Sequence, residues 1–205
     1  MVRTTESLHA SLDALAEREK AFAEVLNAHG KPEPRLSEPG VETLLRTIVG
    51  QQVSVQAARS MWNKLIAKYG QPVDLEAILA ASDEELREAG LSRQKAGYAR
   101  SLAGLVLSGE LDLAHLPEDD EEAIAHLIKI KGIGRWSAEI YLLFAEGRPD
   151  VWPAGDLAVQ AGLAKLLGLE ERPSEKATRE LAEDWRPHRG AAAIFTWHCY
   201  NNPAL

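Results

Sequence analysis

The stretch "IKGIGRWSAEIYLLF", residues 130–144, contains a Gly-X-Gly turn between two segments of helical periodicity. On both sides of the turn, apolar residues recur at i, i+3 and i+4, the spacing of one helix face. Glycine adopts positive φ at little cost and, having no Cβ, lets another backbone approach closely. The stretch therefore predicts one helix over 121–130, a tight turn, and a second helix over 135–145.

The rest of the chain has the same periodicity, and no run of alternating β-branched residues marks a strand. Further helices are expected at 5–28, 41–49, 53–69, 74–80, 83–88, 156–167, 174–184 and 187–200, with another that begins after Ser92. The connector "HGKPEPRLSEPG" (29–40) is rich in helix breakers and follows the first helix. The sequence therefore predicts an all-α fold.

Composition narrows the possible functions. The 205 residues carry a net charge of −8 with a pI near 5.3, so a generally basic surface for nucleic acid is excluded and any polyanion site must be local. Cys199 is the only cysteine, which excludes a disulfide framework within the chain and a four-cysteine zinc or iron–sulfur site. The sequence shows no signal peptide and no membrane span, so a cytoplasmic location is expected.

The Gly-X-Gly turn is a candidate anion-binding site. Backbone N–H groups at the start of the second helix carry partial positive charge, and Lys131 and Arg135 add side-chain charge. The spacing differs from that of a P-loop, and a dinucleotide fingerprint would need a preceding strand where the sequence is helical. An ordinary helix–helix turn that merely needs glycine remains the alternative.

The pattern around the turn resembles a known element. Apolar residues precede Gly132, Ile133 and Gly134, and the small Ala138 follows, as in the helix-hairpin-helix that grips a DNA phosphate backbone. With "GQQVS" (50–54) and "WPAGD" (152–156), the chain from about residue 40 onward resembles the helix-hairpin-helix DNA glycosylase superfamily, and within it the 3-methyladenine DNA glycosylase II branch.

The resemblance implies a DNA-binding set. Its members are Gln51, Gln52, Lys131, Gly132, Ile133, Gly134 and Arg135. Gln52 falls where the family inserts a side chain into the gap left by a flipped nucleotide, and a glutamine can both fill volume and hydrogen-bond the orphan base. The alternative for "GQQVS" is a helix-capping loop with solvated glutamines.

Asp156 matches the family's catalytic aspartate, because it follows Gly134 by 156 − 134 = 22 residues. A carboxylate there can stabilise an oxocarbenium-like centre and orient or activate water. The alternative is a plain helix N-cap, which "PAGD" before an apolar helix would suit and which is compatible with catalysis.

Trp136 stands where the lyase branch carries the lysine that forms a Schiff base, so the sequence favours a monofunctional enzyme that uses water. An indole face would stack on a cationic alkylated base, whereas a core tryptophan is the alternative. His188 stands where some relatives carry a tryptophan, so the resemblance implies that it contacts the base, and a structural role is the alternative. Trp185 and Trp197 are expected to be structural.

The resemblance further implies two lobes with an active-site cleft between them. Residues 35–148 would form a central helical lobe ending in the hairpin, and 1–34 with 149–205 a second lobe that carries Asp156. No zinc is expected, since the six histidines do not cluster. No iron–sulfur cluster is expected either, because the cysteine-rich tail of the endonuclease III branch is missing. Sodium or potassium could bind the backbone carbonyls of Ile128, Ile130 and Ile133.

The sequence therefore predicts a monomeric glycosylase that excises alkylated bases such as 3-methyladenine and 7-methylguanine from double-stranded DNA by base flipping. Two alternatives stay open: a non-catalytic helix-hairpin-helix DNA-binding protein, and a glycosylase for oxidised or deaminated bases. Because the net charge is acidic, a narrow basic strip and steeply salt-dependent binding are expected.

Overall fold

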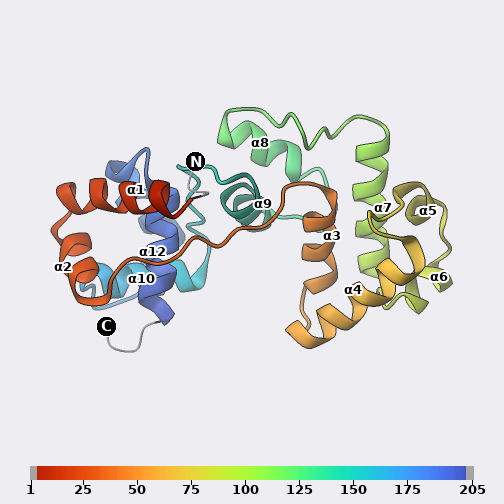
Figure 1. Ribbon diagram of the computed structural model, residues 1–205, viewed down its shortest axis with the longest axis horizontal. Helices are drawn as coiled ribbons and strands as arrows, with labels where there is room; N and C mark the ends of the chain where they lie inside the picture. The colour runs from red at the N-terminus through yellow and green to blue at the C-terminus, as the bar shows by residue number, and fades with distance from the viewer. Residues whose placement is uncertain (1–3, 202–205) are drawn as a thin grey trace. The chain divides into compact units, whose positions relative to one another are not determined.

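The structure is a computed structural model that describes residues 4–201. Within that range the chain is helical and has no β-strand, as the periodicity predicts (Figure 1). None of these helices is both long enough and apolar enough to cross a bilayer. The chain divides into two compact units, Met1–Ser37 with Leu142–Leu205, and Glu38–Tyr141, and each is described separately. Residues 1–3 and 202–205, which the expected second lobe includes, lie outside the described range.

The first unit contains α1 (Thr5–Arg18), α2 (Lys20–His29), a π-helical segment (Leu142–Glu146), α10 (Leu157–Leu167), α11 (Glu175–Leu181), a 3-10 turn (Glu183–Trp185) and α12 (Arg189–Asn201). The prediction of a single helix over 5–28 is wrong, because the backbone is extended at Glu19 (φ −126°, ψ 112°). No glycine or proline marks this break. It allows α1 to pack against α12 while α2 packs against α10.

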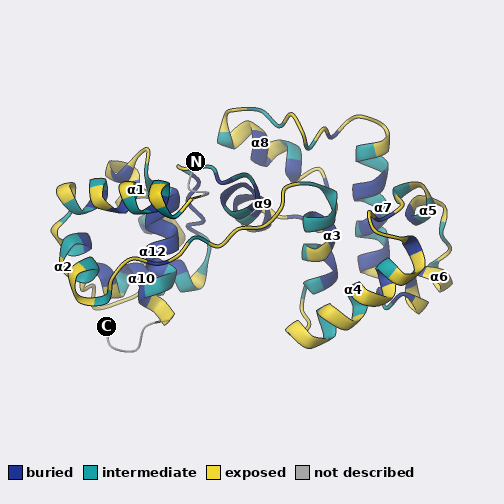
Figure 2. Ribbon diagram, in the orientation of Figure 1, coloured by how far each residue is buried: buried dark blue, intermediate teal, exposed yellow. Residues whose placement is uncertain are grey.

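Aromatic rings fill the core of the first unit. Phe22 stacks on Phe195 with ring centroids 5.6 Å apart and meets Trp185 edge-on at 5.0 Å. Trp185 in turn contacts Trp152, whose indole N–H donates to the Thr178 carbonyl at 2.9 Å. Trp185 is therefore structural, as expected. The buried residues of α12 appear dark blue in Figure 2.

Helices α10 and α12 cross very closely. A Cβ on Gly162 of α10 would lie 1.9 Å from the carbonyl oxygen of Thr196 on α12, so only glycine fits at the crossing. The crossing fixes the start of α10 relative to the middle of α12. Asp156, the N-cap of α10, and Trp197, the neighbour of Thr196, are therefore set on a rigid pair of helices.

The second unit contains α3 (Val41–Gly50), α4 (Val55–Tyr69), α5 (Leu75–Ala80), α6 (Asp83–Glu88), α7 (Arg93–Leu107), α8 (Asp120–Leu127) and α9 (Arg135–Tyr141). Ser92 caps α7 as predicted, and Ser82 caps α6 in a capping box. Helix α7 packs against α3, α5 and α6, while α3 also contacts α4 and α9. The expected helix 135–145 starts at Arg135 but changes to π geometry after Tyr141.

Candidate functional site

The two glycines of the α8–α9 turn serve different purposes. Gly132 has φ +85°, and a Cβ there would lie 2.2 Å from the ring of Tyr98, so the fold itself requires glycine. A Cβ on Gly134 would meet no atom within 4 Å. Internal packing therefore does not explain Gly134, whereas the close approach of an external backbone would.

The turn also presents unused donors. Within residues 4–201, no acceptor bonds the backbone N–H of Gly132 or of Gly134. The Lys131 amide donates to the Ser101 hydroxyl at 3.1 Å, and the Ile133 amide donates to the Ile130 carbonyl at 3.0 Å. The two glycine amides are therefore available to an anion such as a phosphate.

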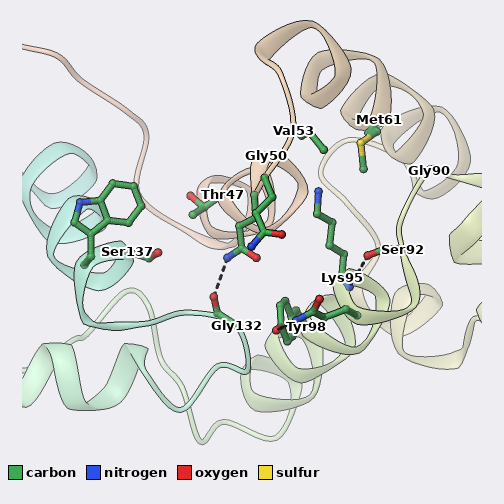
Figure 3. A pocket seen from close by; sticks show the side chains of 14 residues that line it. Thr47, Gly50, Val53, Met61, Gly90, Ser92, Lys95, Tyr98, Gly132 and Ser137 are labelled. Atoms are coloured by element: carbon green, nitrogen blue, oxygen red, sulfur yellow. Dashed lines mark hydrogen bonds between the residues drawn. The ribbon is translucent and has the colours of Figure 1, made fainter. Parts of the chain in front are cut away.

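The "GQQVS" loop is tied to this turn. The Gln51 side-chain amide donates to the Gly132 carbonyl at 2.8 Å, so the loop and the hairpin are held together although 81 residues separate them (Figure 3). Gln51 thus has a structural partner that the sequence did not reveal. The solvated-loop alternative is wrong for Gln51, whose side chain bridges two segments.

Gln52 is exposed and has φ 54°. Within residues 4–201, it is the only non-glycine residue with a positive φ. Such a backbone costs roughly 1–3 kcal/mol in a residue with a Cβ and is frequent at functional sites. The loop projects Gln52 from a base fixed by Gln51 on one side. On the other side, the Ser54 hydroxyl caps α4.

Lys95 supports the base of the same loop and was not expected from the sequence. Its ammonium donates to the Val49 carbonyl at 2.7 Å, at the C-terminal end of α3, where a cation is favourable. The side chain is buried, and this burial lowers the pKa of Lys95. A lysine on α7 therefore fixes the end of α3 from which the loop begins.

These elements surround a hollow of about 1040 Å³ within the second unit. Its lining includes both loop glutamines, Gly132, Lys95, and Trp136 with Ser137 at the start of α9 (Figure 3). Trp136 is 49% exposed, so it is not the core residue that the alternative required. The hollow combines an aromatic face with amide and ammonium groups.

The positive side chains of the hairpin differ in availability. Arg135 donates to Glu121 at 2.8 Å and to Glu139 at 2.9 Å, and hydrogen bonding to Glu121 raises the pKa of the guanidinium. Its charge is thus largely offset by two carboxylates. Lys131 is exposed and forms no ion pair within the described part of the chain.

Asp156 lies in the first unit, at the N-terminus of α10. Its Oδ1 accepts the backbone N–H groups of Ala158 at 2.8 Å and Val159 at 2.9 Å, as the N-cap reading predicts. A third donor reaches the same oxygen, the indole N–H of Trp197 at 3.1 Å. Three donors on one oxygen fix the orientation of the carboxylate.

Trp197 contacts the Asp156 carboxylate, and sequence reasoning missed this contact because it expected Trp197 to be structural. Its ring also packs on Phe144, with centroids 5.4 Å apart. The 41 residues between Trp197 and Asp156 leave no local signal of their contact, which arises from the close crossing of α10 and α12.

His188 stands just before α12 and is partly buried. Burial, with a smaller contribution from Arg18, lowers the pKa of the imidazole, and Asp150 opposes this effect. His188 is therefore neutral at physiological pH.

Residues 4–201 contain no group of three or more His, Cys, Asp or Glu side chains placed to hold a metal. The carbonyls of Ile128, Ile130 and Ile133 are neutral oxygen donors, the kind that replaces the hydration shell of a monovalent cation. The Ile130 carbonyl accepts the Ile133 amide, which uses one of its two lone pairs. The donor set thus fits sodium or potassium.

Curated proteins share much of this sequence. The chain is 35% identical over 160 residues to DNA-3-methyladenine glycosylase 1 of Schizosaccharomyces pombe. The aligned region covers 76% of this chain and 70% of that protein. It is 26% identical over 162 residues to YfjP of Bacillus subtilis, which covers 75% of this chain. The chain spans only 56% of the length of YfjP.

Solved structures share the fold. The crystal structure of DNA-3-methyladenine glycosidase from Bacillus halodurans superimposes with a TM-score of 0.87 at 28% identity, over 95% of this chain and 90% of that one. The 3-methyladenine DNA glycosylase of S. pombe in complex with abasic DNA gives a TM-score of 0.77 at 28% identity, over 92% and 95%.

The profile of the HhH-GPD superfamily of base excision DNA repair proteins matches residues 45–188, a range that includes the glutamine loop, the hairpin and Asp156. With the helical fold and the hairpin geometry, this match is decisive: the chain belongs to the HhH-GPD superfamily of base excision DNA repair proteins.

Proposed function

We propose that this protein is a monofunctional DNA glycosylase that removes alkylated bases, of the 3-methyladenine and 7-methylguanine type, from double-stranded DNA. The observation that carries the proposal is the Asp156 carboxylate, held by three N–H donors in a chain of this superfamily. The names of the S. pombe and B. halodurans relatives support the class of lesion.

In the proposed cycle, the hairpin binds first. The amides of Gly132 and Gly134 receive a phosphate of the lesion strand, with Lys131 adding charge at the edge. Gln52 then occupies the gap left by the flipped nucleotide. Flipping costs a few kcal/mol and least for a damaged base, so a side chain already projected from a fixed loop favours extrusion of the lesion.

Trp136 offers its half-exposed indole face to the flipped base. Alkylated purines such as 3-methyladenine and 7-methylguanine carry positive charge, and a cation on an indole gains about 0.5–2 kcal/mol over a neutral base. A neutral His188 would add no repulsion to such a base. The aromatic face therefore gives selectivity for cationic lesions.

Asp156 assists the chemical step. The bond between C1′ and the base nitrogen breaks with its electron pair leaving on the base, and the sugar becomes oxocarbenium-like. The carboxylate stabilises that positive charge, and a water oxygen bonds to C1′ while its proton passes to the carboxylate. Position 136 holds no amine, so no Schiff base forms and the product is an abasic site in an unbroken strand.

The same proposal covers partners and setting. Double-stranded DNA with alkylated bases is the partner, a monomer acts in the cytoplasm at the nucleoid, and no cofactor is required. A sodium or potassium ion at the carbonyls of Ile128, Ile130 and Ile133 would link hairpin to phosphate. It would take no part in bond cleavage.

The test is release of free methylated bases from alkylated duplex DNA by the wild type and by Asp156→Asn. Asparagine keeps an Oδ1 acceptor and caps a helix as well as aspartate, so the variant should fold and bind duplex normally. We expect release to fall by about 10²–10³-fold, the loss typical of removing one charge-stabilising group.

Two outcomes would contradict the proposal. No release by either protein, with duplex binding indifferent to lesions, would leave a non-catalytic helix-hairpin-helix DNA-binding protein. Release of oxidised or deaminated bases instead of methylated ones would keep the enzyme and replace the lesion class.

A further inference from the structure

A second, smaller hollow lies between α3 and α4 in the same unit. It measures about 360 Å³, and its polar lining comes from Arg46 on α3 and from Arg59 and Asn63 on α4. Val49 and Val55 complete the end nearest the glutamine loop. This hollow, called here the arginine groove, has no part in the function proposed above.

The arginine groove holds a planar cation in a fixed position. The guanidinium carbon of Arg46 lies 4.0 Å from the centre of the Trp62 ring, and Trp62 is buried. A guanidinium stacked on an indole keeps its edge N–H donors for a second partner. Glu42 lies four residues before Arg46 on α3, the i,i+4 spacing at which a helix favours an ion pair. Within the described residues, the two nevertheless form no ion pair.

The charge around the groove is unusual for this chain. Within the described residues, neither Arg46 nor Arg59 pairs with a carboxylate, whereas the other four arginines of the unit all do: Arg87, Arg93, Arg100 and Arg135. Helix α4 contains no aspartate or glutamate over its fifteen residues. A protein of net charge −8 thus keeps two arginines at a hollow whose lining includes no aspartate or glutamate.

The glutamine loop separates this groove from the larger hollow. Arg46 and Val49 line the groove, whereas Thr47 and Gly50 line the larger hollow, and consecutive helix residues point about 100° apart. After Gln52 the chain reaches Val55 in three residues, at most about 11 Å. A phosphate of a duplex penetrated by Gln52 is therefore within reach of the groove.

We propose that the arginine groove binds a phosphodiester of the strand opposite the lesion, through Arg46 and Arg59. This inference rests on the proposed function, because it takes Gln52 as the residue that enters the duplex. If the hairpin and Trp136 hold the lesion strand on one side of the loop, the face of α3 and α4 beyond the loop meets the complementary strand. Phosphate is the ligand that stacked and unpaired guanidinium groups recognise.

The first experiment measures equilibrium binding of a duplex containing a stable abasic-site analogue, as a function of salt. Arg59→Gln should weaken binding about tenfold at low salt and reduce the slope of log affinity against log salt by about 0.9. The matched control is Arg87→Gln on α6, which removes the same charge from an exposed side chain of the same unit. The control should bind like the wild type.

Arg46 needs two variants because its side chain also packs on Trp62. Arg46→Gln should reproduce the loss of slope, and Arg46→Lys, which keeps the charge, should restore the slope. Circular dichroism at the binding temperature checks that both variants are folded. An equal loss of slope in Arg87→Gln, or unchanged slopes in the Arg46 and Arg59 variants, would overturn the inference.

A second experiment identifies the strand. Neutral methylphosphonate linkages are placed one at a time along either strand of the duplex. On the complementary strand, one linkage should weaken the wild type but cause no further loss in Arg59→Gln, because both changes remove the same contact. Coupling only on the lesion strand, or additive losses at every linkage, would contradict the assignment.

The two proposals can fail separately. A wild type that releases methylated bases while the Arg46 and Arg59 variants bind normally would keep the glycosylase and remove the groove. A wild type that binds duplex with the expected coupling but releases no base would keep the groove and remove the glycosylase.

Discussion

Asp156 owes its orientation to donors from two helices, and one of them can be removed with little other change. Trp197→Phe should retain the ring contact with Phe144 but lose the indole N–H that reaches Oδ1 at 3.1 Å. We expect kcat for methylated-base release to fall about tenfold, as for loss of one hydrogen bond to a charged group, with KM little changed.

Trp185→Phe is the control, because Trp185 belongs to the aromatic core and does not contact Asp156. It should lower the free energy of unfolding while leaving kcat of the folded protein unaltered. If both substitutions lower kcat equally, Trp197 acts through general stability and not through the carboxylate.

At the scale of the element, the α8–α9 hairpin separates two roles of glycine. Gly132→Ala places a methyl group 2.2 Å from the Tyr98 ring at φ +85°, so we expect a loss of roughly 2–4 kcal/mol in the free energy of unfolding. Gly134→Ala meets no atom within 4 Å and should change stability by less than about 1 kcal/mol.

For DNA affinity, Gly134 is the more informative of the two glycines. Gly134→Ala puts a methyl group where a phosphate backbone would approach, so binding of an abasic duplex should weaken about tenfold in a fully stable protein. Urea unfolding and fluorescence anisotropy provide the two measurements. Normal binding by Gly134→Ala would show that the hairpin does not contact DNA through this glycine.

The elements also show what a single sequence can and cannot predict. Local signals predicted the all-α fold, the cap Ser92 and the turn at Gly132, because capping and periodicity act within a few residues. The break at Glu19 was missed, since it reflects the different packing partners of α1 and α2. Hydrogen bonds between residues far apart in the sequence were also missed, because they too depend on how the helices pack.

In the candidate site, these distant pairings decide geometry. The Gln51–Gly132 bond spans 81 residues and the Trp197–Asp156 bond spans 41, and neither leaves a local trace. The residue types were predictable because the motifs carry them. The partners that hold these residues in position are set by helix packing, and the periodicity of the sequence does not specify that packing.

At the scale of the whole molecule, the net charge of −8 opposes binding to undamaged DNA. Glu24→Gln, Glu84→Gln and Glu180→Gln together would change it to −8 + 3 = −5, at exposed positions whose ion pairs contribute little. We expect tighter binding to undamaged duplex at low salt, a difference that disappears at high salt, and unchanged single-turnover release.

The measurement is a competition assay in which undamaged duplex inhibits release from alkylated DNA. The triple variant should be inhibited at lower competitor concentrations than the wild type. Equal inhibition would mean that the acidic surface lies beyond the reach of bound DNA, outside a Debye length of about 10 Å at 0.1 M salt.

The close crossing of α10 and α12 at Gly162 determines when the carboxylate acquires its environment. Two of its donors come from α10 and one from α12, and the backbone contact at Thr196 locks these helices together in the absence of DNA. The donors around Asp156 are thus placed during folding, and in the proposed reaction the carboxylate would need no reorientation when positive charge develops on the sugar. In the function proposed above, the carboxylate would therefore be oriented before substrate arrives, and DNA binding energy would remain available for distorting the duplex.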